Sequence, residues 1–101
     1  MVRHTVAFKL KFDAGSQAEH DFFKAAKELA RIPVVKNFEC LRQISKKNDY
    51  DFGISMEFDS MADYDVYSSN SDHMQFVRDH WSTEVADYIE IDYVPYDEAE
   101  N

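Results

Sequence analysis

The sequence has 101 residues, 45% of them hydrophobic and 15% aromatic, which is enough for one packed domain and too short for two. Eleven Lys and Arg residues against 20 Asp and Glu residues give a net charge of −9, which argues against a nucleic-acid partner and an anionic membrane surface. The single cysteine, Cys40, excludes an intrachain disulfide, so we expect a cytoplasmic protein. The start of the chain does not resemble an export signal, and no apolar run is long enough to span a bilayer.

The first part of the chain is typical of a strand followed by a helix. Apolar and polar residues alternate over residues 2–12, which predicts a half-buried strand with its even-numbered residues on one face. Ser16 with Glu19 three positions later predicts a capped helix start. The helix should end at Ile32, because the following Pro33 disfavours a helical conformation in its predecessor.

The remainder predicts two strands, helices and a last strand. The strands are expected over residues 34–44 and 50–58, and the second alternates more regularly. Ser60 and Asn70 are candidate helix caps. Helical spacing over residues 73–85 predicts one helix face with His73 and His80 among apolar residues. A strand over residues 89–93 follows, and residues 97–101 are expected to form an acidic tail outside a domain of residues 1–96.

This β-α-β-β-α-β order predicts a ferredoxin-like α+β fold, with a four-stranded antiparallel sheet covered by helices on one face. The first strand should lie between the third and the fourth, with its even-numbered residues facing the helices. Ten of the 11 basic residues lie in the first 48 positions and 15 of the 20 acidic ones lie after them. We therefore expect cross-strand charge pairs on the uncovered face, and solvated unpaired charges are the alternative. The residues expected there are Lys9, Lys11, Glu57, Glu90 and Asp92.

The uncovered face of this sheet also predicts a partner. Thr5, Ala7 and Ser55 are small, and Ile89 or Tyr93 could join them. A sheet with one bare face is commonly buried against an identical sheet, so we expect a homodimer formed through this face.

Six segments resemble the stress-responsive dimeric α/β-barrel (Dabb) family. They are VRHTVAFKLK (2–11), IPVV (32–35), YDFGISMEFDS (50–60), YDVY (64–67), DHMQFV (72–77) and IDY (91–93). The likeness spans residues 2–95. It implies a ferredoxin-like subunit and a dimeric α/β barrel formed by two sheets.

Some members of that family resemble polyketide cyclases of the olivetolic acid cyclase type. In these, a histidine and a tyrosine promote an aldol-type ring closure, and by position they correspond to His73 and Tyr67. The first-strand histidine corresponds to His4, and an aromatic pair in the pocket corresponds to Phe22 and Phe23. Two positions depart from the cyclases: a further pocket histidine is replaced by Phe52, and the usual His-Pro pair before the helix is Asn70-Ser71.

The residues themselves support acid–base chemistry at this place. His73 begins a predicted helix, where the positive end of the helix dipole favours a neutral imidazole that can act as a general base. Tyr67 could then donate a hydrogen bond to a developing enolate oxygen. The alternative is that His73 only orders the loop before its helix, and that His4 is a core residue. The resemblance implies a small aromatic or polyketide-like ligand, and we expect its pocket to be lined by His4, Phe8, Phe22, Phe23, Phe52 and Phe76.

The sequence predicts neither a cofactor nor a metal ion. Gly15 and Gly53 stand alone, so no glycine-rich phosphate loop can form. His80 and Glu84 lie one helical turn apart near other carboxylates, and whether they bind a metal is left open. Cys40 has no basic helix start near it, so we expect an inert thiol.

Whether the protein is an enzyme is also left open by the sequence. The first reading is a small-molecule pocket with cyclase-like or lyase-like acid–base chemistry on an aromatic or carbonyl compound. The second is a structural or stress-response homodimer without catalysis, and the third is a cofactor-independent monooxygenase-like protein. A pocket of roughly 300 Å³ or more that reaches His73 would favour the first reading.

Overall fold

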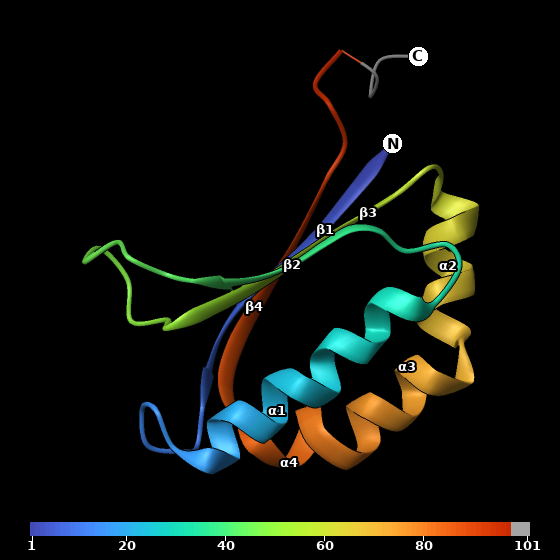
Figure 1. Ribbon diagram of the computed structural model, residues 1–101. Coiled ribbons are helices and arrows are strands. Elements are labelled where there is room, and N and C mark those ends of the chain that lie inside the picture. Colours follow the sequence, from blue (N-terminus) through green and yellow to red (C-terminus); the bar gives the residue numbers. More distant parts are fainter. Residues whose placement is uncertain (98–101) are drawn as a thin grey trace.

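The computed structural model describes residues 1–97 and has a four-stranded antiparallel sheet in the order β2-β3-β1-β4. All helices lie on one side of this sheet (Figure 1). The strands are β1 (Val2–Leu10), β2 (Lys36–Arg42), β3 (Phe52–Phe58) and β4 (Val85–Tyr93). The helices are α1 (Gln17–Lys27), α2 (Met61–Ser69), α3 (Ser71–Phe76) and α4 (Ser82–Glu84). The predicted ferredoxin-like fold is confirmed, with β1 between β3 and β4.

Side-chain caps explain where the helices begin. The Ser16 hydroxyl accepts a hydrogen bond from the Glu19 N–H at 3.2 Å, and the Glu19 carboxylate accepts one from the Gly15 N–H at 3.2 Å. Gly15 has a φ of +76°, a backbone conformation that glycine adopts without strain. Before α2, the Ser60 hydroxyl accepts from the Asp63 N–H in the same way. Asn70 caps α3 by accepting from the Asp72 N–H, so all three predicted caps are formed.

The boundaries differ from the sequence prediction mainly at the second helical region. The helix expected over residues 73–85 is divided into α3, a π-helical turn (Val77–Trp81) and α4, and Val85 is already in β4. The Glu84 carbonyl accepts a hydrogen bond from the Lys11 N–H at 2.9 Å, which joins the end of α4 to the end of β1. Since Val85 pairs with Leu10, the sheet begins where the apolar spacing alone predicts helix.

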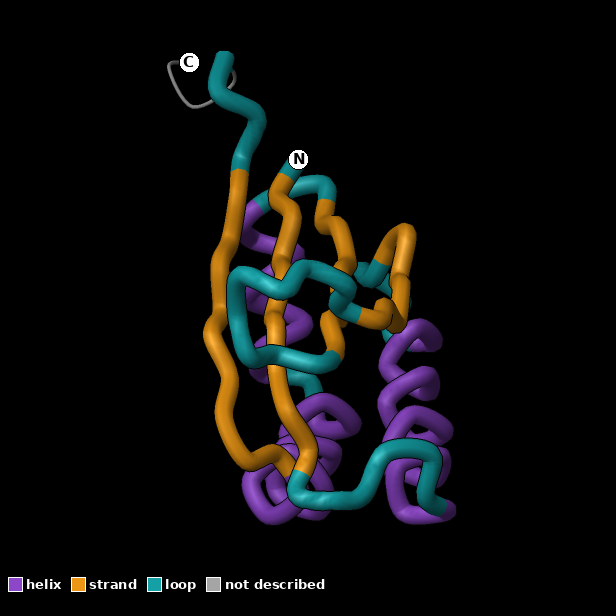
Figure 2. Tube along the Cα trace, turned by 90° about the vertical axis from the view of Figure 1, so that its left-hand side faces the viewer, coloured by secondary structure: helices purple, strands orange, loops and turns teal. Residues whose placement is uncertain are grey.

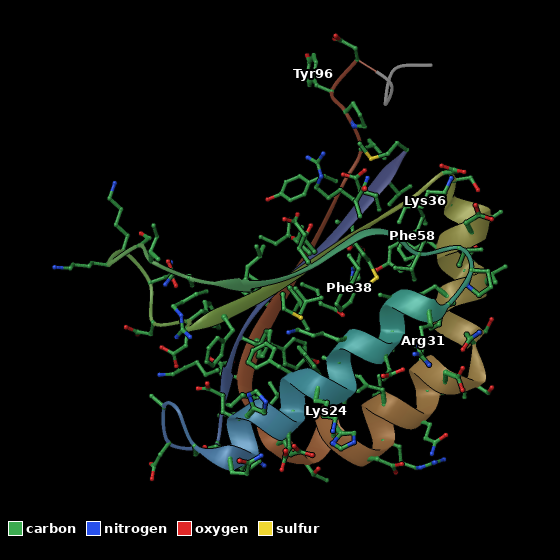
Figure 3. All side chains as sticks on the ribbon, viewed as in Figure 1. Lys24, Arg31, Lys36, Phe38, Phe58 and Tyr96 are labelled. Carbon is green, nitrogen blue, oxygen red and sulfur yellow. The ribbon has the colours of Figure 1, made fainter. Side chains whose placement is uncertain are left out.

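The core lies between the sheet and the helices. The even-numbered residues of β1 and β3 are buried on this side, as predicted. Phe8 is fully buried, and its ring packs against those of Phe22, Phe23, Phe52 and Trp81 at centroid distances of 5.1 to 6.0 Å. This ring cluster fills one end of the layer, while Phe58 lies at the other end beside α2 (Figure 3).

The acidic residues of β4 lie on the opposite side of the sheet from the one predicted. His4 pairs with Asp92 and Val6 pairs with Glu90, so both carboxylates lie on the helix-covered side. The prediction that they accompany Lys9 and Lys11 on the uncovered face was wrong. In β4 the acidic residues face the helices and the apolar residues face outward, which is the reverse of the pattern in β1 and β3. Lys9 lies opposite Asp87 instead.

The uncovered face therefore carries the apolar residues of β4. Ile89, Ile91 and Tyr93 are 41 to 50% exposed, and the two isoleucines border a shallow hollow beside Thr5 and Ala7. Glu57 was expected beside Lys9 or Lys11 on this face, but it forms its ion pair with Arg3, at 3.3 Å. β4 runs beside β1 along its length and forms an edge of the sheet (Figure 2).

Two sequence predictions concern the ends and the membrane. The expected acidic tail of residues 97–101 lies outside the described residues except for Asp97. Tyr96, shortly before it, is 82% exposed and projects beyond the end of the sheet (Figure 3). Among residues 1–97, none of the helices has the length and apolar character needed to cross a membrane.

Candidate functional site

A cavity of about 190 Å³ lies between the sheet and the helices, beside the ring cluster, with which it shares Trp81. β1, β3 and β4 form its floor, and α2, α3 and the π-helical turn contribute the other walls. Its lining residues are His4, Val6, Leu29, Ile54, Met56, Tyr67, His73, Phe76, Val77, Trp81, Tyr88 and Glu90. The fold thus brings together the three residues singled out for chemistry, His4, Tyr67 and His73.

His73 lies in the first turn of α3, after the Asn70 cap. Its Nδ1 is 3.1 Å from the carbonyl oxygen of Ser68. A carbonyl can only accept, so Nδ1 carries the proton and Nε2 keeps its lone pair. Burial lowers the pKa of His73 below its ordinary value, although the hydrogen bond to Ser68 opposes this. The imidazole is therefore neutral near pH 7, and desolvation is the main cause of its lowered pKa.

Tyr67 projects from α2 beside His73. Its ring centroid is 4.3 Å from that of His73, and the residue is 3% exposed. Burial raises the pKa of Tyr67, and the nearby Glu90 carboxylate adds to the rise, so the phenol keeps its proton and can donate it in a hydrogen bond. The Tyr67 hydroxyl has no hydrogen-bond partner among residues 1–97. In this range, every polar side-chain atom that is buried from solvent does have a partner. The hydroxyl must therefore border open space, which the cavity supplies.

His4 is held by two residues that the sequence did not single out. Its Nδ1 is 2.6 Å from Asp92 Oδ1 and 2.8 Å from the Tyr64 hydroxyl, which in turn donates to Asp92 Oδ2 at 2.8 Å. The Tyr64 ring stacks on Phe58 with centroids 5.1 Å apart. Because Nδ1–H donates a hydrogen bond to the Asp92 carboxylate, Nε2 is the nitrogen left for the cavity. The strand register of Asp92 with His4 is the signal that could have revealed this triangle.

The predicted aromatic lining is only partly assembled around the cavity. Phe76 lines it, whereas Phe8, Phe22, Phe23 and Phe52 belong to the ring cluster and do not. Their place is the part of the layer where rings pack against rings. Trp81 takes part in both regions, since it touches Phe8 and lines the cavity from the π-helical turn. Such turns widen a helix locally and are frequent at functional sites.

His80 and Cys40 lie away from this cavity. The Nδ1 of His80 is 2.8 Å from a carboxylate oxygen of Glu84, and the ring packs near Phe76 at 5.7 Å. Within the described part of the chain, no group of three or more His, Cys, Asp and Glu side chains could hold a metal ion. Burial raises the pKa of the Cys40 thiol, which disfavours the reactive thiolate.

A ferredoxin-like subunit whose sheet and helices enclose a cavity lined by His4, Tyr67 and His73 is thus the class that the fold and site define. The chain belongs to the stress responsive A/B barrel domain (Dabb) family, whose profile matches residues 2–95. It is 52% identical to a Dabb family protein of Mesorhizobium loti with a ferredoxin-like fold, with a TM-score of 0.92 over 93% of this chain and 95% of that one.

Two more distant structures share the fold. A dimeric ferredoxin-like protein of unknown function from Thermobifida fusca is 20% identical, with a TM-score of 0.77 over 93% of this chain and 90% of that one. A hydroxynitrile lyase from Passiflora edulis is 15% identical, with a TM-score of 0.81 over 93% and 92% of the two chains. No functionally curated protein matches the chain in sequence.

Proposed function

We propose that the protein is a homodimer whose cavity performs acid–base chemistry on a small carbonyl compound, with His73 as general base and Tyr67 as hydrogen-bond donor. One observation carries the proposal: a neutral imidazole with a free Nε2 and a phenol that has no hydrogen-bond partner among residues 1–97 line the same partly enclosed cavity. Such pairs are typical of sites that remove a proton next to a carbonyl group.

The chemistry follows from these two groups. Nε2 of His73 takes a proton from the carbon beside the carbonyl, and the electron pair moves onto the carbonyl oxygen to form an enolate. The Tyr67 hydroxyl donates a hydrogen bond to that oxygen, and its raised pKa keeps the proton on the phenol. The enolate then attacks an electrophile in a ring closure or takes the proton back from His73. Asp92 and Tyr64 fix His4 so that its Nε2 can orient the same substrate.

The size of the cavity limits the substrate. Its 190 Å³ falls below the roughly 300 Å³ at which ordinary ligand pockets begin, and is slightly larger than a cavity of about 150 Å³ that holds benzene. A compound with a single ring and a short side chain fits, whereas a long polyketide does not. The fold of the Passiflora edulis hydroxynitrile lyase is in line with lyase-type chemistry, although at 15% identity the likeness concerns the fold alone.

The dimer is proposed from the uncovered sheet face. Ile89 and Ile91 expose apolar surface there beside Thr5 and Ala7, and one face of the sheet has no helix over it. Burial of such a face against a second copy removes apolar surface from water on both subunits. The Thermobifida fusca protein with this fold is dimeric, which agrees with the proposal.

The catalytic proposal is tested by hydrogen exchange at carbon. Acetophenone has one ring and protons beside its carbonyl, and NMR in D₂O follows their replacement by deuterium. We expect the protein to accelerate exchange, and His73→Gln and Tyr67→Phe to reduce the acceleration by about a hundredfold. His20→Gln, on the outer part of α1, removes an exposed histidine and should leave the rate unchanged. Equal rates for the wild type and His73→Gln would refute the proposal.

A second candidate, a non-catalytic structural homodimer, is favoured by a different observation. Four of the aromatic side chains expected in a pocket fill the core instead, and the remaining cavity is small. This candidate predicts that wild type and His73→Gln both fail to accelerate exchange while the dimer persists, so the same experiment separates the two.

A further inference from the structure

Glu90 is the one residue with a carboxyl side chain in the lining of the cavity. We propose that Glu90 determines specificity, so that the cavity accepts uncharged or cationic single-ring compounds and excludes carboxylates. This inference rests on the proposed function, because it concerns the ligand of the same cavity.

The strand register places Glu90 at this position. Glu90 pairs with Val6, whose buried side chain points to the helices, so the glutamate points to the same side. Tyr88 and Asp92, two positions before and after, share that side. Glu90 itself is exposed, which places its carboxylate at the open part of the cavity rather than in its depth.

The charge of Glu90 reaches the reactive groups. Burial is the main cause that raises the pKa of Tyr67, and the Glu90 carboxylate is the second. For His73, burial lowers the pKa, while Glu90 acts in the opposite direction. Both effects require the negative charge to lie within electrostatic range of the space between the phenol and the imidazole. A ligand bound there is subject to the same field.

Nothing in the described part of the chain neutralises this carboxylate. Glu90 forms neither an ion pair nor a hydrogen bond there, whereas Glu57, Glu84 and Asp92 each have a basic or histidine partner. The cavity lining contains neither Lys nor Arg. A ligand carboxylate would therefore enter against one unpaired negative charge and find no cation of fixed charge inside.

The expected size of the effect follows from Coulomb's law. Two like charges about 7 Å apart change an equilibrium constant by roughly threefold at a dielectric constant of about 80, and by roughly fiftyfold at about 20. Glu90 is exposed but the cavity is partly enclosed, so a change of about tenfold in dissociation constant is expected between an anionic and a neutral ligand of one shape.

Three compounds of nearly the same shape test this: benzamidine (positive), benzamide (neutral) and benzoate (negative). Their dissociation constants are measured by NMR titration at pH 7.5 with the wild type, Glu90→Gln and Asp87→Asn. Asp87 lies on the same strand but pairs with Lys9 on the other face, so this control removes an equal charge away from the cavity. We expect wild type and Asp87→Asn to bind benzamide about tenfold more tightly than benzoate, and Glu90→Gln to bind the two within about twofold.

The outcomes separate the inference from the proposed function. If benzamide binds and the discrimination against benzoate is the same in Glu90→Gln as in the wild type, Glu90 does not select the ligand, although the cavity still binds small rings. Tighter binding of benzoate than of benzamide by the wild type would also overturn the inference. If none of the three compounds binds the wild type, the cavity does not take single-ring compounds, and the proposed function falls with the inference. A loss of preference in Glu90→Gln alone supports the proposal.

Discussion

The triangle of His4, Asp92 and Tyr64 allows a prediction of stability that uses only observed contacts. Tyr64→Phe removes the hydroxyl that donates to Asp92 and contacts His4, while the ring can remain stacked on Phe58. The substitution therefore removes hydrogen bonds without opening a cavity. A surface tyrosine, Tyr96→Phe, provides the matched control because it is 82% exposed.

The magnitude follows from the surroundings of the hydrogen bond. A hydrogen bond to a charged group contributes about 1.5–3 kcal/mol. The Asp92 side chain is 44% exposed, so water can replace part of the lost interaction. We expect Tyr64→Phe to lower the free energy of unfolding by about 1 kcal/mol. For a chain of 101 residues this corresponds to a fall in Tm of about 5 °C, and Tyr96→Phe should change it by less than about 2 °C.

Urea unfolding measures the free energies and thermal unfolding measures the Tm values. The protein concentration is kept fixed, since self-association would make both quantities depend on it. A double-mutant cycle with Asp92→Asn then isolates the contact. If the hydroxyl and the carboxylate interact as the distances indicate, the two substitutions should be non-additive by about 1 kcal/mol. Additive effects would refute the reasoning, because they would mean that Tyr64 stabilises the protein only through its ring.

Two further predictions concern the dimer and pH. Ile91→Lys places a charge on the uncovered sheet face and should give a monomer by sedimentation velocity. The control Val66→Lys, at an exposed position of α2, should leave a dimer. A dimeric Ile91→Lys would contradict the proposed interface. Burial lowers the pKa of His73 from its ordinary 6.5, so below about pH 6.5 the unfolded chain binds more protons than the folded one and stability falls with falling pH. Urea titrations from pH 7.5 to 5 should show a shallower fall for His73→Gln, and parallel curves would exclude this origin.

Most of the fold could be predicted because local rules agree with the tertiary structure. The alternation of β1 and β3 matches a sheet with one covered face, and Ser16 and Ser60 cap helices as their spacing indicates. The helical spacing after His73 was a weaker guide. It continues to Val85, but pairing with Leu10 draws that residue into the sheet. Tertiary contacts therefore outweigh local periodicity at this junction.

The site could be predicted only in part. His4, Tyr67, His73 and Phe76 lie around one cavity, but four other phenylalanines pack into the core. Aromatic residues at core-facing positions look alike in a sequence whether they fill space or surround it, because packing at that scale depends on all neighbours at once. Glu90 was missed for a different reason: the acidic residues of β4 were expected on the uncovered face of the sheet, where they would pair with lysines.

β4 carries two sets of side chains with different surroundings. Glu90 borders the cavity from one face, while Ile89 and Ile91 border the bare sheet from the other. Because side chains alternate strictly along a strand, deleting a single residue between Asp87 and Ile89 would exchange the two sets at once. Isoleucines would then fill the cavity, and carboxylates would stand on the surface proposed for dimerisation. Length changes in this strand are thus expected to be less tolerated than any single substitution in it, because they would disturb the proposed ligand selection and the proposed dimer interface together.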